Sequence, residues 1–257
     1  MLSNLTKNNL AIDMNNVWLS YDNINYVLNG ITLSIKKSIN YTIIGHSGSG
    51  KSTLLKIING LLTPSKGTIK VFGIIPDHQN RKFKNLMKNI GYIPQSLGLV
   101  KNITVLDNVL IGALTRINKI KSFFKIVPDV EIDNAQNAIK MVGLEDKTEK
   151  KVFTLSGGEK RRVAIARALV QKPILLLADE IVSELDHVTS KEIMNLIIET
   201  QHKLNLTSVM IHHDIKLALD YADMISVLQK GQKILEIGVD GNTITEFDVT
   251  KNQLAKL

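Results

Sequence analysis

The sequence predicts an α/β fold built around a phosphate-binding loop. Short apolar runs typical of buried strands alternate with helical patterns along the 257 residues. One of these runs, residues 174–178, is continuously apolar, as in a strand buried on both faces. Another, residues 41–44, leads through a glycine-rich loop into a helical pattern, which is the strand, loop and helix order that a phosphate site requires.

The loop after residue 44 matches the pattern G-x-x-x-x-G-K-[ST]. Its glycines allow backbone N–H groups to turn toward an anion, and the following helix adds the positive end of its dipole. We expect Lys51 to reach the β- and γ-phosphates of a nucleotide, and to face solvent without one, and we expect Ser52 to bind Mg²⁺. A structural turn with a chance lysine is the alternative, but it leaves the flanking strand and helix unexplained. The candidate nucleotide-binding residues of this loop are Gly45, His46, Ser47, Gly48, Ser49, Gly50, Lys51, Ser52 and Thr53.

Composition indicates a globular chain without a membrane span. No apolar run approaches the roughly 20 residues that a spanning helix requires. The N-terminus lacks the basic and apolar regions of a secretory signal, so we expect a cytoplasmic protein. The sequence contains no cysteine, which excludes disulfides and cysteine-bound metal. The net charge of +8 would suit nucleotide, anionic lipid or nucleic acid, but lysines that solvate the surface explain most of it.

Two polar side chains follow predicted strands in the first half of the chain. Residues 10–21 mix apolar and polar positions, with Ile12, Met14 and Trp18 on one parity, and residues 31–35 alternate more cleanly, so both segments are predicted as half-buried strands. Tyr21, at the end of the first, either stacks on a base or fills a sheet edge. Gln95 follows a strand that begins at Ile90, and it either binds Mg²⁺ or water or simply faces solvent.

Residues 102–142 change to a helical pattern. Thr104 and Asp107 fit the start of a first helix, and Gly143 fits the end of a second. The segment that connects them, residues 119–125, is basic and aromatic. It either touches a membrane surface or a partner, or serves as a hydrophobic anchor for its loop.

A serine, two glycines and a glutamate precede the next helical pattern. Ser156 and Glu159 fit a capping box, in which each satisfies a backbone N–H group of the other. A capping box does not explain Gly157 and Gly158, because glycine is costly in a helix unless the backbone must approach another group closely. A second anion site at this helix N-terminus is the alternative.

Two adjacent carboxylates follow the apolar run at residues 174–178. Open parallel sheets bind their ligands at this end of their strands. We expect Asp179 to bind Mg²⁺, and Glu180, pointing the other way by strand alternation, to orient or deprotonate an attacking water.

Two histidines end a later apolar strand that starts near residue 208. Only one of His212 and His213 can face a nucleotide, because successive side chains of a strand point to opposite faces. His213 is the better candidate, since Asp214 after it fits as the cap of the next helix. The following segments, residues 224–228 and 233–237, resemble a closing hairpin.

These motifs occur together in the order found in the nucleotide-binding subunits of ABC transporters, which the chain resembles from about Tyr21 to Gly238. The resemblance implies a P-loop NTPase core with a mixed sheet, an N-terminal antiparallel β subdomain and an inserted α-helical subdomain. It implies one ATPase domain, residues 8–240, made of a core (8–95 and 172–240) and a helical subdomain with the signature motif (96–171), and then a C-terminal tail (241–257).

The same resemblance implies roles for the motifs. Two chains form a head-to-tail dimer, in which each ATP lies between the phosphate loop of one chain and residues 156–159 of the other. By family, Tyr21 stacks on adenine, Gln95 senses Mg²⁺ and the transport partner, and Asp186 belongs to the turn that crosses the dimer. The candidate catalytic residues are Lys51, Gln95, Glu180 and His213, and the candidate metal ligands are Ser52, Gln95 and Asp179. The ATP-binding residues are those of the phosphate loop with Tyr21, Ser156, Gly157, Gly158, Glu159 and Asp186.

Within the family, residues 102–112 and 122–124 look like the subunits that power phosphonate import. We therefore expect an ATP hydrolase, with ATP and Mg²⁺ bound, that powers import of a phosphonate or a related oxyanion. The implied partners are membrane permease subunits, a second copy of the chain and an extracytoplasmic solute-binding protein, without nucleic acid. The implied location is the inner face of the cell membrane.

Other functions remain as alternatives. One is an exporter or a lipid-type or lipoprotein-type ABC ATPase, and another is an ABC ATPase that acts on nucleic acid or ribosomes, favoured only by the basic charge. A third alternative is a small-molecule kinase that uses the same loop, but this function would not account for residues 156–159 or for His213. Three positions depart from the family, which usually has proline at Ile181, a small residue at Glu184 and a turn glycine at Ser38.

Overall fold

The computed structural model describes residues 9–114, 127–240 and 243–249. Within this part of the chain there are two compact units, one up to Met87 and again from Gln201 onward, the other Lys88–Thr200. The second unit is wider than the helical subdomain expected at residues 96–171, because it also includes two strands. The basic segment at residues 119–125 lies outside the described residues, as do residues 122–124 of the phosphonate-type pattern.

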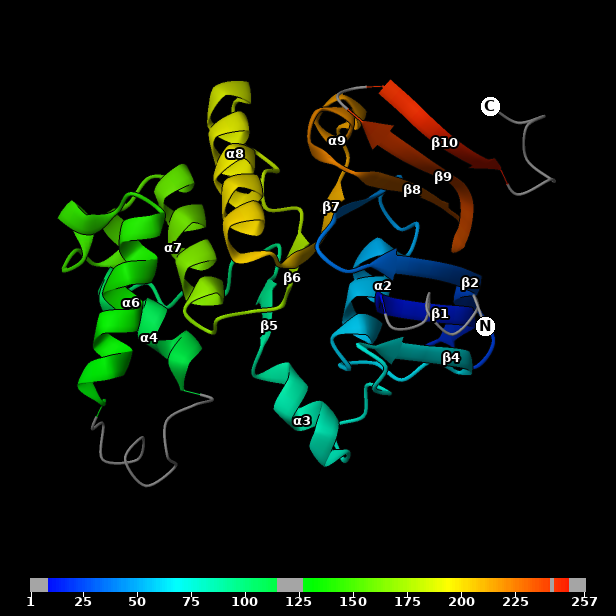
Figure 1. The fold of residues 1–257 in the computed structure, drawn as a ribbon, viewed down its shortest axis with the longest axis horizontal. Helices are drawn as coiled ribbons and strands as arrows, with labels where there is room; N and C mark the ends of the chain where they lie inside the picture. Colours follow the sequence, from blue (N-terminus) through cyan, green and yellow to red (C-terminus); the bar gives the residue numbers. More distant parts are fainter. Residues whose placement is uncertain (1–8, 115–126, 241–242, 250–257) are drawn as a thin grey trace. The chain divides into compact units, whose positions relative to one another are not determined.

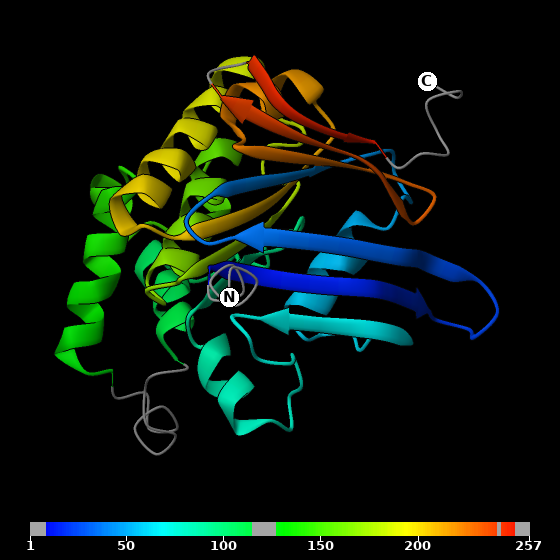
Figure 2. The same cartoon turned by 45° about the vertical axis from the view of Figure 1, so that its right-hand side comes forward.

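The first unit contains the expected antiparallel β subdomain. Strand β1 (Leu10–Ser20) is central and pairs antiparallel with β2 (Tyr26–Lys36) and β4 (Lys66–Val71). Met14 lies opposite Leu33 on one side and Ile69 on the other, and all three side chains are buried. The predicted alternation holds in β2 from Ile31 to Ile35, whereas in β1 the buried positions change from Ile12 and Met14 to Val17 and Leu19 across a register shift. Figure 2 shows these three strands side by side, from blue to cyan.

A second sheet of the first unit carries the phosphate loop. Its central strand β3 (Asn40–Ile44) runs parallel to β7 (Thr207–His212) and β8 (Met224–Gln229), and every residue of β3 and β7 is buried. Strand β9 (Gln232–Asp240) pairs antiparallel with β8, which confirms the hairpin and makes the sheet mixed. The helices of this unit are α2 (Lys51–Ile58), α3 (Arg81–Met87) and α9 (Ile215–Tyr221).

The expected C-terminal tail contributes one further strand. Strand β10 (Thr243–Val249) pairs antiparallel with β9, with Ile244 opposite Val239 (Figure 1). The sequence after Gly241 did not predict this strand. Its backbone hydrogen-bond partners belong to β9, so a pattern within the segment alone does not define it.

The second unit combines a parallel strand pair with helices. Strand β5 (Ile90–Ile93) pairs with β6 (Leu175–Asp179). Helices α4 (Val105–Ala113), α6 (Asp129–Met141) and α7 (Gly157–Leu169) pack together, as Figure 1 shows in green. A Cβ atom on Gly112 of α4 would lie 2.2 Å from the carbonyl oxygen of Arg167, so glycine there allows α4 and α7 to approach closely. Helix α8 (His187–Leu204) begins in this unit, which also contains the short 3₁₀ helices η1 (Glu145–Lys147) and η2 (Val152–Thr154).

The helix caps predicted from sequence are confirmed. Thr104 and Asp107 form a capping box at α4, and the side chain of Asp214 accepts hydrogen bonds from the N–H groups of Lys216 and Leu217 at the start of α9. Gly143 follows α6 with φ +68°, the left-handed conformation that ends a helix.

Ser38 shows how one departure from the family is accommodated. It adopts φ +62° in the turn before β3, a conformation that favours glycine. Its N–H donates to Thr207 Oγ1 at 2.9 Å, and its carbonyl accepts from Gln201 Nε2 at 3.0 Å. These bonds hold the serine in the glycine-like conformation.

His212, at the end of β7, is fully buried. Neither of its ring nitrogens has a hydrogen-bond partner in the described part of the chain. Burial lowers the pKa of this imidazole from 6.5 to about 4, and the charge of Asp214 opposes this shift. The folded protein therefore keeps His212 neutral, in agreement with the structural role expected for it.

We predict that His212 makes the protein acid-sensitive. Between pH 6.5 and about 4, the unfolded chain binds a proton that the folded chain excludes, so the free energy of unfolding falls as the pH is lowered. The loss should reach roughly 3 kcal/mol at the acid end of this window. Urea unfolding of wild type and His212→Leu at several pH values measures it. The variant should lose less stability on acidification, and the same change at the exposed His202 serves as control. Equal acid sensitivity of wild type and His212→Leu would contradict the prediction.

Candidate functional site

The phosphate loop connects β3 directly to α2. Gly50, the N-cap of α2, has φ +102°. A Cβ atom at this position would lie 2.7 Å from the Leu28 side chain and 3.0 Å from the Val27 carbonyl oxygen. Glycine is therefore required by both the backbone conformation and the neighbouring strand β2. As expected, the loop leads into the N-terminus of a helix, where the dipole favours an anion.

The expectation that Lys51 faces solvent is wrong. Its side chain is buried, and Nζ donates to the carbonyl oxygens of Gly45 at 2.8 Å and His46 at 3.0 Å. An ammonium group this deeply buried requires acceptors, and the carbonyls of its own loop supply them. The charge is thereby held at the centre of the loop, where a phosphate group would need it.

Tyr21 and His213 both lie at the phosphate loop. Tyr21 is 60% exposed, and its hydroxyl lies 3.3 Å from Thr53 Oγ1 at the start of α2. His213 is exposed, and its Nδ1 lies 3.1 Å from the Gly45 carbonyl oxygen. His213 is the first residue after β7, so the bend that follows the strand separates it from the buried His212, and the expectation that both histidines belong to one strand is wrong.

Asn29 and Gly231, which the sequence did not single out, support the phosphate loop through hydrogen bonds. Asn29 of β2 donates its backbone N–H to Gly231 O at 2.8 Å and its side-chain amide to Lys230 O at 2.9 Å. The N–H of Gly231 donates in turn to Ser49 O at 3.1 Å, within the phosphate loop. A Cβ atom on Gly231 would lie 2.4 Å from Val27 O. The turn at residues 230–231 was predicted as a hairpin, but nothing in the sequence indicates what it contacts.

The second unit brings Gln95 into contact with Glu180 and places Asp179 near Tyr92. Asp179 ends β6 and is 4% exposed. Burial of the Tyr92 ring, and to a lesser extent the charge of Asp179, raises the pKa of Tyr92. Gln95 Nε2 donates to Glu180 Oε2 at 2.8 Å. Glu180 lies beyond the last strand residue and has φ +51°. Its direction is therefore set by a turn, and the expectation that strand alternation sets it is wrong.

Arg161 holds the turn that follows Glu180. Its Nε donates to the Ile181 carbonyl oxygen at 2.5 Å, and a second guanidinium nitrogen donates to the carbonyl of Ser183. Burial lowers the pKa of Arg161. Nothing in the sequence singles out this residue, and its bonds to the turn appear only in the fold.

Ser156 and Glu159 form the predicted capping box at α7. Glu159 N donates to Ser156 Oγ at 3.2 Å, and Ser156 N donates to Glu159 Oε2 at 2.7 Å. With Gly157, Gly158 and Asp186 they line a pocket of about 460 Å³. The cap occupies the N–H groups of Ser156 and Glu159 but not those of Gly157 and Gly158, so the backbone can form both the cap and an anion site.

Asp186 is also fixed by local bonds. Its carboxylate accepts from Thr189 N at 2.9 Å and from Thr189 Oγ1 at 2.6 Å, and the pKa of Asp186 is lowered by these bonds. The turn that places it in the pocket thus continues directly into α8.

The predicted Mg²⁺ ligands are a hydroxyl, an amide and a carboxylate. Ser52 belongs to the first unit, whereas Gln95 and Asp179 belong to the second. All three are hard oxygen donors, and Mg²⁺ usually keeps several waters and takes few protein ligands, so the donor set fits. Among the described residues there is no cluster of three or more acidic, histidine or cysteine side chains that would hold a metal by itself. Of the helices in the described ranges, none is long and apolar enough to span a membrane.

A family model for the ABC transporter matches residues 28–183. The chain is 40% identical to the phosphonates import ATP-binding protein PhnC 2 of Synechococcus sp. over 210 residues, 81% of this chain and 78% of that one. It is 38% identical to the methionine import ATP-binding protein MetN of Campylobacter jejuni over 224 residues, 83% of this chain and 67% of that one.

Solved structures show the same fold. CbiO1 of Clostridium perfringens, part of the ABC transporter complex cbiONQ, is 33% identical, with a TM-score of 0.78 over 89% of this chain and 88% of that chain. The dimeric structure of MJ0796, a bacterial ABC transporter cassette, is 30% identical, with a TM-score of 0.78 over 90% of this chain and 99% of that chain.

We predict that the turn behind the phosphate loop controls ATP affinity. Gly231→Ala places a methyl group against Val27 O and should displace Ser49, which weakens ATP binding by about tenfold or more. Gly73→Ala is the matched control, because both glycines have φ +77° but nothing lies within 4 Å of a Cβ atom at Gly73. Titration of each folded variant with a fluorescent ATP analogue measures the effect. Equal affinities in the two variants would show that the turn does not position the loop.

Proposed function

This chain belongs to the ABC transporter family, and we propose that it is the ATP-hydrolysing subunit of an importer whose membrane-spanning subunits are separate polypeptides. The family match covers residues 28–183, which includes the phosphate loop, Gln95 and the signature helix α7. Members of this family hydrolyse ATP to power transport, and their cassettes dimerise. The observation that carries the import role is that several relatives named for import match most of this chain.

The proposed solute class is phosphonates. Relatives named for phosphonate import are 34–40% identical over 81–95% of this chain, and the matches cover 78–92% of those proteins. Methionine import is the second candidate, since two relatives named for it are 35% and 38% identical. Those matches cover only 63% and 67% of the methionine proteins, which favours the first class.

In the proposed mechanism, the phosphate loop binds the triphosphate through its backbone N–H groups and Lys51, and Tyr21 stacks on the adenine. Ser52, Gln95 and Asp179 hold Mg²⁺, which would neutralise phosphate charge. Glu180 is the base for the attacking water, and the amide of Gln95, which donates to Oε2, orients its carboxylate. His213, held beside the Gly45 carbonyl, contacts the γ-phosphate.

The proposed active assembly is a dimer. Ser156, Gly157, Gly158, Glu159 and Asp186 of one chain close on the ATP bound to the phosphate loop of the second chain. The positive end of the α7 dipole and the pocket at its N-terminus suit a phosphate group. The dimer would drive permease subunits at the inner face of the cell membrane, with a solute-binding protein outside.

We predict that Glu180→Gln binds ATP but lowers steady-state hydrolysis by about 10²-fold or more, because an amide cannot accept the proton of water. Light scattering with Mg²⁺ and ATP should then show an accumulated dimer. Glu199→Gln is the matched control, since Glu199 is an exposed glutamate of α8 that does not line the pocket at the start of α7. Normal hydrolysis by a monomeric Glu180→Gln protein would refute the assignment of the base and of the dimer.

A transport assay tests the solute class. In cells that lack this chain, its expression should restore uptake of a labelled alkylphosphonate, and Lys51→Met should not, because the loop then loses its ammonium group. Restoration of methionine uptake instead would favour the second candidate.

A further inference from the structure

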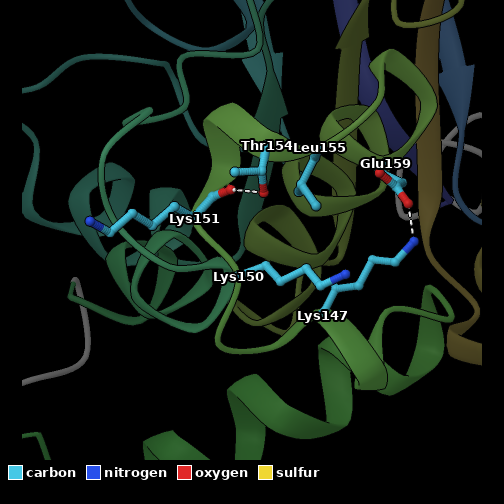
Figure 3. A pocket seen from close by; sticks show the side chains of 6 residues that line it. All are labelled: Lys147, Lys150, Lys151, Thr154, Leu155 and Glu159. Carbon is cyan, nitrogen blue, oxygen red and sulfur yellow. Dashed lines mark hydrogen bonds and ion pairs between the residues drawn. The ribbon is translucent and has the colours of Figure 1, made fainter.

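A lysine-rich pocket of about 600 Å³ lies beside the start of α7 (Figure 3). It is lined by Lys147, Lys150, Lys151, Thr154, Leu155 and Glu159. Figure 3 shows that Lys147 extends toward Glu159, whereas Lys151 points the opposite way. The function proposed above uses Glu159 only as part of the signature motif and gives these lysines no role.

Glu159 connects this pocket with the capping box. One carboxylate oxygen, Oε2, accepts the Ser156 N–H at 2.7 Å, and the other, Oε1, is ion-paired with Lys147 Nζ. The two side chains of the pair are 25% and 23% exposed. The bond to Lys147, followed by that to Ser156, lowers the pKa of Glu159. Lys147 thus fixes the carboxylate of Glu159, which in turn accepts the hydrogen bond from the Ser156 N–H.

The charge of this carboxylate opposes anion binding. The N-terminus of a helix carries about half a positive charge, which attracts phosphate. Glu159 places a full negative charge in the same turn, and it lines the pocket that contains Ser156, Gly157 and Gly158. Without a neutralising partner, its repulsion of a triphosphate would exceed the attraction of the dipole. Lys147 supplies the neutralising charge.

We propose that Lys147 is a positioning residue for the signature helix, which orients Glu159 and cancels its charge so that the N-terminus of α7 can close on ATP bound to a second chain. This inference rests on the proposed dimer. Lys147 touches no nucleotide in this arrangement and acts only through Glu159. Its loss should therefore weaken ATP-driven dimerisation but leave ATP binding to the phosphate loop of the monomer unchanged.

The test uses the full chain with Glu180→Gln, in which dimers accumulate. Adding Lys147→Met should raise the ATP concentration for half-maximal dimerisation by about fivefold or more, as measured by light scattering. Lys150→Met is the matched control. Lys150 lines the same pocket, but in the described part of the chain its ammonium has no hydrogen bond or ion pair, so its removal should change this concentration by less than about twofold. Affinity for a fluorescent ATP analogue, measured at protein concentrations below dimerisation, should be the same in both.

A double-mutant cycle separates this role from a general effect of positive charge. With Glu159→Gln present there is no carboxylate charge to neutralise, so adding Lys147→Met should have less than about a twofold effect relative to Glu159→Gln alone. An undiminished effect in that background, or equal effects of Lys147→Met and Lys150→Met, would overturn the inference. If the Glu180→Gln parent does not dimerise with ATP, the proposed function fails. If the parent dimerises and Lys147→Met has no effect, only the role of Lys147 fails.

Discussion

A loop that turns backbone N–H groups toward a bound phosphate must be held largely through its carbonyl groups and by its neighbours, and the first unit is organised around this constraint. Glycines give the loop its conformation, so its rigidity must come from neighbours. Strand β3 anchors one end and α2 the other, while the turn at Gly231 holds Ser49 from behind. Lys51 closes the loop from within, through the carbonyls of Gly45 and His46. Such preorganisation is what allows a phosphate site to act without reorganising.

Charge is handled differently at the two helix N-termini that serve the proposed nucleotide site. At α2 a buried lysine adds to the positive dipole end, with no acidic residue in the first turn. At α7 the first turn contains Glu159, whose capping bond orders Ser156 but whose charge would repel phosphate. The ion pair with Lys147 reconciles the two demands, because it keeps the cap and cancels the charge. Both helix ends can thus present net positive potential to an anion.

The proposed base is placed by a strained turn rather than by the regular strand before it. Glu180 has φ +51°, which a residue with a side chain adopts only when its surroundings impose it. Gln95 holds its carboxylate, and Arg161 holds the carbonyls of Ile181 and Ser183 on the other side. The buried Ile181 replaces the family's usual proline, whose ring would fix the backbone angle φ. The two hydrogen bonds from Arg161 therefore stabilise a turn that proline does not restrict.

The sequence by itself determined the features that depend on neighbours within a few positions. The phosphate loop before α2 and the capping boxes at Thr104 and Ser156 follow from local spacing. Only the tertiary structure decided the burial of Lys51, the turn at Glu180, the pairing of β10 and the contact of Asn29 with Lys230, which lie 201 positions apart. These contacts join residues that are far apart along the chain, and no local sequence pattern indicates such pairs. They form only when the strands and helices pack together.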